Sequence, residues 1–137
     1  MTENTDVPPE ILTPLRSLCL GLPETYEEEG WVGVRWLVAT RTFAHVLVID
    51  AGWPPAYARA AGTDGPATVL TCRSSGPELD ALGSSGPPWF RARWGRDMVG
   101  LVLEGAVDWD DVAELVTESY RFLAPQRLAA QVTRPPG

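Results

Sequence analysis

The run Trp89 to Arg96, WFRARWGR, combines residue types suited to binding an anion. Arginine guanidinium groups stack on tryptophan rings and hydrogen-bond carboxylate or phosphate oxygens in a fork. If the run is extended, Trp89, Arg91 and Arg93 share one side, and Phe90, Ala92 and Trp94 share the other. It therefore predicts a site for an anion or a nucleic-acid backbone. The alternative is that the aromatic rings pack in the core and the arginines pair with acidic residues that follow.

A second candidate for chemistry is His45, the one histidine of the chain. An enzyme with a small-molecule pocket around His45, Asp97 and Tyr120 would need a convergent acid–base geometry, which sequence spacing does not establish. The chain has no recognised nucleotide, nucleophile or metal motif and no Cys-x-x-Cys. We therefore expect no catalytic residues, no cofactor and no metal site, and expect His45 to be a packed core residue.

Charge is unevenly distributed along the sequence. The formal net charge is -7, which repels a polyanion on average and counts against general nucleic-acid binding. However, residues 86–100 carry Arg91, Arg93 and Arg96 against one aspartate, whereas residues 104–118 carry only acidic charges. DNA binding through Arg91, Arg93 and Arg96 is therefore kept as an alternative function.

The elements that must position these residues are best marked near the C-terminal end. Asp108 fits an N-cap, and apolar residues recur at three- and four-residue spacing up to Leu123, which predicts a helix that Pro125 ends. A short helix is expected over 126–132. Strands are predicted over the apolar runs 31–39, 42–50, 67–72 and 98–103, and a short helix over 78–82.

The remaining predictions concern the first helix, two connecting segments and the faces of one strand. The first helix is expected to start at Thr13 and Pro14, although a start near Pro9 with Pro14 as a kink is the alternative. The loop 24–30 holds three glutamates that we expect to be solvated, and 51–66 is expected to be a long exposed connection. Phe43, His45, Leu47 and Ile49 are predicted to point one way from their strand.

Several short motifs in order resemble the MmcQ/YjbR family. They are Trp94 to Arg96, Val99 to Leu101, Val107 to Trp109, Ser119-Tyr120 and Ala124 to Leu128, with Leu18 to Pro23 and Arg41 to Ala44 before them. The resemblance implies a bacterial protein with a two-layer α+β fold, in which helices cover one face of an antiparallel sheet of about five strands. Some members of the family are described as double-wing DNA-binding proteins.

We predict one such domain over 13–132, a loose segment over 1–12 and a tail over 133–137. The preferred function is a non-enzymatic binding module of unknown ligand. Its candidate ligand-binding or DNA-binding residues are Arg91, Arg93, Trp94, Arg96, Tyr120 and Arg127. Nucleic acid or another protein is the expected type of partner. No apolar run reaches the roughly 18 residues of a spanning helix, and no signal peptide is recognised, so we expect a cytoplasmic protein without membrane contact. Cys19 and Cys72 are expected to be buried thiols.

Overall fold

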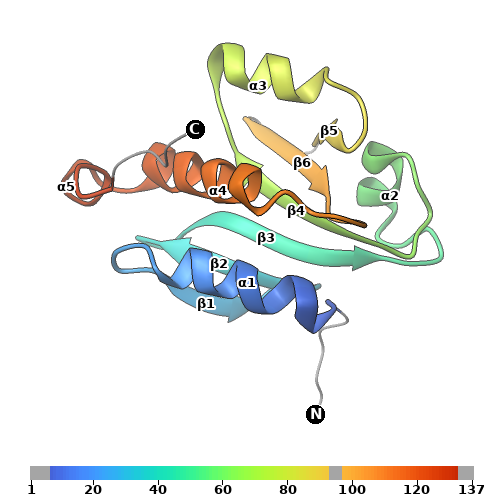
Figure 1. Ribbon diagram of the computed structural model, residues 1–137, viewed down its shortest axis with the longest axis horizontal. Coiled ribbons are helices and arrows are strands. Elements are labelled where there is room, and N and C mark those ends of the chain that lie inside the picture. Colours follow the sequence, from blue (N-terminus) through green and yellow to red (C-terminus); the bar gives the residue numbers. More distant parts are fainter. Residues whose placement is uncertain (1–6, 93–96, 133–137) are drawn as a thin grey trace.

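Six strands form one antiparallel sheet in the computed structural model, which describes residues 7–92 and 97–132 (Figure 1). The strand order across the sheet is β1-β2-β3-β4-β6-β5. The strands are β1 (Tyr26–Glu29), β2 (Val34–Val38), β3 (Arg41–Ile49), β4 (Ala67–Arg73), β5 (Trp89–Arg91) and β6 (Met98–Val102). The helices are α1 (Pro9–Leu20), α2 (Pro55–Ala61), α3 (Gly76–Gly83), α4 (Trp109–Leu123) and α5 (Gln126–Ala129). The α+β class is therefore confirmed, with one strand more than expected.

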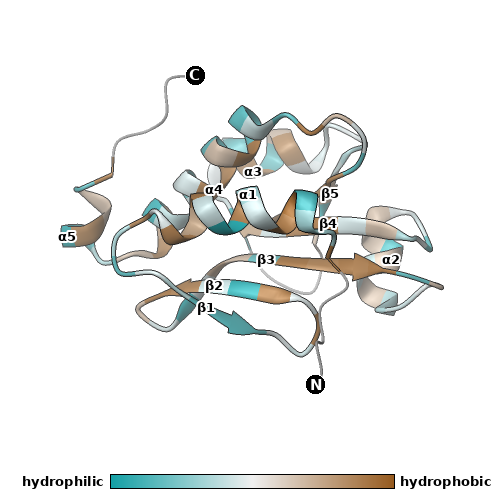
Figure 2. Cartoon of the chain, turned by 60° about the horizontal axis from the view of Figure 1, so that its bottom comes forward, coloured by the Kyte–Doolittle hydropathy of each residue, from teal (hydrophilic) through white to brown (hydrophobic). Residues whose placement is uncertain are grey.

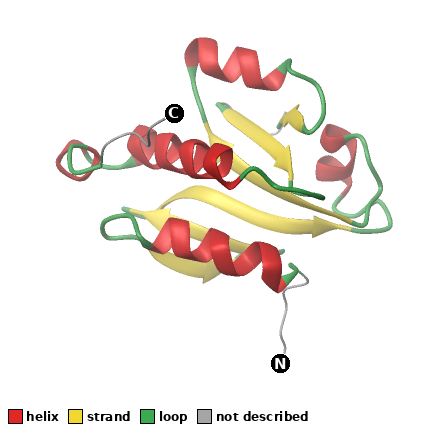
Figure 3. Cartoon of the chain, in the orientation of Figure 1, coloured by secondary structure: helices red, strands yellow, loops and turns green. Residues whose placement is uncertain are grey.

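The helices lie unequally on the two faces of the sheet. Figures 2 and 3 show α1, α3 and α4 on one side of the strands, with α2 at the far end of β3. Leu15 of α1, Leu79 of α3 and Leu115 of α4 join one buried core with Val46 and Leu70 of the sheet. We call this side the covered face. On the other side, which we call the open face, a smaller cluster forms where α2 packs on β3, β4 and β5.

Helix α4 begins and ends where the sequence predicts. The Asp108 carboxylate accepts hydrogen bonds from the backbone N–H groups of Asp110 and Asp111, at 3.1 and 3.3 Å. Helix α1 instead starts at Pro9, so the predicted start at Thr13 is wrong and the alternative with Pro14 inside the helix is confirmed. The burial of Val7 and Ile11 explains the earlier start, because both residues pack in the core.

The glutamates expected in a solvated loop instead form strand β1, which accounts for the sixth strand. The Glu27 carboxylate accepts a hydrogen bond from Arg16 Nε at 2.8 Å and another from the Trp36 indole at 2.9 Å. These hydrogen bonds, the Arg16 one foremost, lower the pKa of Glu27 against the effect of burial. Glu28 accepts from Arg35 at 2.7 Å. Hydrogen-bond partners that are distant in the sequence therefore stabilise strand β1.

A bulge in β3 changes which side chains share a face. Trp36 pairs with Ala44 and Leu37 with Thr42, so Phe43 is an extra residue in the ladder. Phe43 consequently packs in the covered core together with Ala44, and its ring meets Tyr120 edge to face at 5.5 Å. The prediction that Phe43 shares a row with His45 is therefore wrong. Leu47 and Ile49 lie on the open face, opposite to Phe43.

The connection 51–66 is more ordered than predicted. It contains α2, whose Tyr57 and Ala58 are buried against β3 and β4. Gly65, with φ of 86°, leaves no room for a side chain, since a Cβ there would lie 1.9 Å from the Ile49 carbonyl oxygen. The segment is therefore packed tightly onto the sheet. Trp53 stays 52% exposed.

A candidate anion-binding cavity on the open face

A row of polar side chains crosses the open face of the sheet. Arg35 of β2 pairs in register with His45 of β3, His45 with Thr71 of β4, and Thr71 with Gly100 of β6. Directly paired residues in an antiparallel sheet point to the same side. Because their neighbours Ala44, Val46 and Leu70 belong to the covered core, this row lies on the opposite face.

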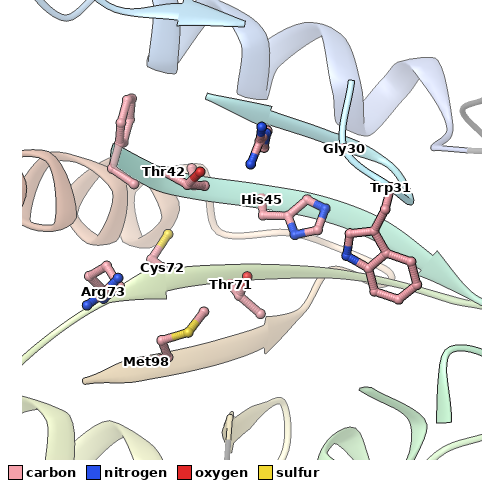
Figure 4. Close-up of a pocket in the computed structure, with 11 residues that line it drawn as sticks. Gly30, Trp31, Thr42, His45, Thr71, Cys72, Arg73 and Met98 are labelled. Atoms are coloured by element: carbon pink, nitrogen blue, oxygen red, sulfur yellow. The ribbon is translucent and has the colours of Figure 1, made fainter. Parts of the chain in front are cut away.

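Side chains of this row surround a cavity of about 200 Å³ (Figure 4). Its lining includes Arg35, His45 and Thr71, with Arg73 and Met98 from the ends of β4 and β6 and Trp31 from the turn before β2. Figure 4 shows Arg73 and Met98 at one end, Trp31 at the other, and His45 and Thr71 between them. Three different strands thus contribute polar groups to one hollow.

Three buried polar atoms at this cavity have no hydrogen-bond partner among the described residues: Arg35 Nε, Thr71 Oγ1 and Arg73 Nε. Thr71 is only 2% exposed. A buried donor without a partner costs about 1–3 kcal/mol, so such groups are rare in folded proteins. Two of the three atoms are guanidinium donors, and in the described lining Arg35 and Arg73 are the charged residues. Arg35 also donates through Nη2 to the Glu28 carboxylate at 2.7 Å, so the described lining offers N–H and O–H donors and one arginine, Arg73, without a carboxylate partner among the described residues.

His45 is held as a neutral ring. Its Nε2 lies 2.6 Å from the Val32 carbonyl oxygen, which can only accept, so Nε2 carries the proton. Burial lowers the pKa of His45, the hydrogen bond to Val32 opposes this, and the positive charge of Arg35 lowers it further. The remaining nitrogen, Nδ1, is then an acceptor. The Tyr57 ring meets the imidazole edge-on at 6.3 Å and fixes its plane.

The row ends at Gly100, which makes space for an aromatic ring. A Cβ at Gly100 would lie 2.1 Å from Phe90 Cζ, so the Phe90 ring lies directly over this glycine. Phe90 is buried in the cluster with α2. It therefore closes the open face on the β5 side.

The sequence model of the YjbR family matches residues 20–122. The chain belongs to the YjbR family. The matched range runs from the end of α1 to Phe122 in α4 and so includes every strand of the sheet. A comparison with curated proteins found no match. In the described part of this YjbR protein, no helix is long and apolar enough to cross a bilayer. Nor do three or more histidine, cysteine or acidic side chains gather at a metal-binding spacing there.

Three of the residues predicted for binding, Arg91, Tyr120 and Arg127, do not line this cavity. Arg91 pairs in register with Val99, which lies on the covered face, and Arg91 Nη1 approaches Asp80 of α3 at 3.9 Å. Tyr120 is fully buried, and its hydroxyl donates to the Pro23 carbonyl oxygen at 2.7 Å. Burial raises the pKa of Tyr120, with Glu24 adding to the effect. Arg127 pairs with Glu24 at 3.2 Å.

The other predicted binding residues, Arg93, Trp94 and Arg96, lie outside the described residues, so their role stays a prediction. The trio suggested for an enzyme is not assembled. His45 lies on the open face, whereas Tyr120 packs against Phe43 on the covered face with its hydroxyl occupied. Cys19 and Cys72 are buried free thiols, as predicted, and burial raises the pKa of both.

Sequence reasoning missed Arg35, Thr71 and Arg73 as site residues. A usable signal was present, because each of three largely apolar strands carries polar residues in its interior, among them Arg35, His45 and Thr71. A polar residue inside a strand that is buried on both sides needs a partner or a ligand. The sequence does not give the cross-strand register that places Arg35, His45 and Thr71 in one row across the sheet.

Proposed function

We propose that this YjbR protein is a non-enzymatic binding module that holds a small anion in the open-face cavity. The observation that carries the proposal is that Arg35 Nε, Arg73 Nε and Thr71 Oγ1, three buried polar atoms without a partner in the described structure, belong to residues that line one cavity. An oxyanion can accept hydrogen bonds from such donors and neutralise the charge of Arg73, whereas the charge of Arg35 is shared with Glu28. A ligand would thus repay the cost of keeping these groups buried.

Calorimetric titration with inorganic phosphate and acetate at constant ionic strength tests this function. Hydrogen bonds to charged groups contribute about 1.5–3 kcal/mol, so Arg73→Gln or Arg35→Gln should each weaken binding roughly 10- to 100-fold. The matched control is Arg59→Gln, which removes the same charge from an exposed arginine of α2 outside the cavity wall. Equal affinity of the wild type and of a variant that carries both Arg35→Gln and Arg73→Gln would refute the proposal.

DNA binding through Arg91 to Arg96 is a separate prediction, and it uses a different surface. Fluorescence anisotropy with a duplex oligonucleotide should then show an affinity that falls steeply from low to moderate salt, because phosphate contacts release counterions. Arg35→Gln and Arg73→Gln should leave that affinity nearly unchanged. Absence of binding at tens of micromolar protein in low salt would exclude it.

A compartment can be proposed from the cysteines. Cys19 and Cys72 both remain reduced and buried in the core. Disulfides are rare in reducing compartments, so two free thiols support a cytoplasmic location. Fractionation of cells that express the chain with an epitope tag tests this proposal, and recovery outside the cytoplasmic fraction would contradict it.

A further inference from the structure

The two ends of the cavity differ in chemistry. Arg73 and the unpaired Thr71 hydroxyl supply donors, whereas Trp31 supplies a flat apolar surface at the opposite end (Figure 4). Trp31 is 69% exposed, more than any other large hydrophobic residue in the described part of the chain. Exposed tryptophan beside a hollow is typical of binding sites, since a ligand that covers the ring gains apolar contact.

Trp31 is held in place although it is exposed. Its ring meets Trp53 at 5.6 Å with the two planes 77° apart. Trp53 in turn is fixed by two backbone hydrogen bonds with Asp50, both of 3.0 Å. A ring supported in this way loses little conformational entropy when a ligand packs against it. The indole is therefore a preformed wall of the cavity.

The size of the cavity limits the ligand. Cavities that bind drug-sized molecules measure roughly 300–1,000 Å³. The present cavity, at about 200 Å³, is smaller. A nucleotide with base, sugar and phosphate would extend beyond it, whereas an anion attached directly to one ring is closer to its size.

We infer that the ligand is a small aryl oxyanion, a carboxylate or phosphate joined to one aromatic ring. Its oxygens accept from Arg35, Thr71 and Arg73, and its ring packs against Trp31. This inference rests on the anion-binding function proposed above and adds the aromatic part. The neutral His45 also lines the cavity, and its Nδ1 is a hydrogen-bond acceptor.

The test compares matched pairs of probes by isothermal titration calorimetry at constant ionic strength: phenyl phosphate with methyl phosphate, and benzoate with acetate. Aromatic contact contributes about 0.5–1.5 kcal/mol beyond the area that is buried, so the aryl member of the preferred pair should bind about 10-fold tighter or more. Whichever pair binds identifies the acid group. Equal affinities within the pair would overturn the inference.

Trp31→Ala should reduce the aryl preference to nearly 1 while the affinity for methyl phosphate or acetate stays unchanged. Trp31→Phe, which retains a ring, should restore most of the preference. A preference that persists in Trp31→Ala would overturn the inference, as would adenosine monophosphate binding tighter than phenyl phosphate.

The two proposals fail differently. If the simple anions bind in an Arg35- and Arg73-dependent manner but the ring adds nothing, the anion-binding function stands and the aryl assignment falls. If none of the four probes binds the wild type, both fall. Circular dichroism of each variant checks that the fold is intact. The Trp31 variants should fold normally, because that side chain is exposed.

Discussion

The two faces of the sheet differ in how their polar groups are treated. On the covered face, the buried Ser119 hydroxyl makes two hydrogen bonds, donating to the Phe43 carbonyl oxygen at 2.6 Å and accepting from the Arg73 N–H at 2.8 Å. On the open face, Thr71 keeps a buried hydroxyl without a partner in the described structure. The comparison indicates that one face is organised for stability, whereas the other retains groups whose cost a ligand would offset.

The largest expected effect contrasts one tryptophan from each face. Trp36→Ala should lower the free energy of unfolding by about 3–5 kcal/mol, because Trp36 is fully buried in the covered core. The control Trp31→Ala should change it by less than about 0.5 kcal/mol, since that ring is exposed. Urea denaturation measures both. Similar losses for the two variants would contradict the division between the faces.

Ser119→Ala should lower the free energy of unfolding by about 1–3 kcal/mol. The substitution leaves the Phe43 carbonyl and the Arg73 N–H without their partner, and Ser119 is fully buried. The comparison is Ser85→Ala, an exposed serine whose hydroxyl bonds only the Ala81 carbonyl oxygen. If chemical denaturation finds equal stability for the two variants, the two hydrogen bonds of the Ser119 hydroxyl contribute little to the stability of the fold.

Thr71→Val should act in the opposite direction. Valine has nearly the shape of threonine but no hydroxyl, so the free protein should gain about 1 kcal/mol of unfolding free energy. The same substitution should weaken anion binding, which calorimetry measures. Thr68→Val, in the same strand, is the control for the change of residue type. A Thr71→Val protein that is less stable than the wild type would mean that its hydroxyl is already satisfied.

The smallest predicted effect concerns pH. Burial lowers the pKa of His45 below its ordinary 6.5, so between these two values the unfolded chain binds more protons than the folded one. Stability should therefore fall as pH drops below about 6.5. The depressed pKa of Glu27 acts in the same direction but only at pH below its ordinary 4.5. Denaturation from pH 7.5 to 5.5 measures the effect.

His45→Gln should flatten that profile, because glutamine does not titrate. A wild-type stability that is constant across this interval, or a slope that persists in the variant, would refute the assignment to His45. His45 is the one histidine of the chain, so the stability between pH 7.5 and 5.5 reports on the open face.

Much of the fold could be predicted because its signals are local. The Asp108 cap, the apolar spacing of α4 and the apolar runs of β3, β4 and β6 all act within a few residues. Strand β1 escaped prediction because its stabilising partners, Arg16 and Trp36, are about ten residues away in sequence. Helix α2 escaped because proline and glycine on both sides suggested a loop.

The candidate site could not be predicted for a related reason. Arg35, His45, Thr71 and Arg73 lie in three strands, and their convergence depends on the cross-strand register. The bulge at Phe43 shifts that register by one residue, so strict alternation misassigns the face of Phe43. The density of arginine and tryptophan in 89–96 is a stronger local signal than a few polar residues in apolar strands.

The outermost strands have a consequence for how molecules of this protein meet. Strand β1, at one edge, presents acidic side chains including the exposed Glu29, and β5, at the other, has three residues. Negative charge and short length both discourage a foreign strand from extending a sheet. Both edges therefore disfavour lateral growth of the sheet, which matters for a protein that exposes Trp31 and Trp53 on its surface.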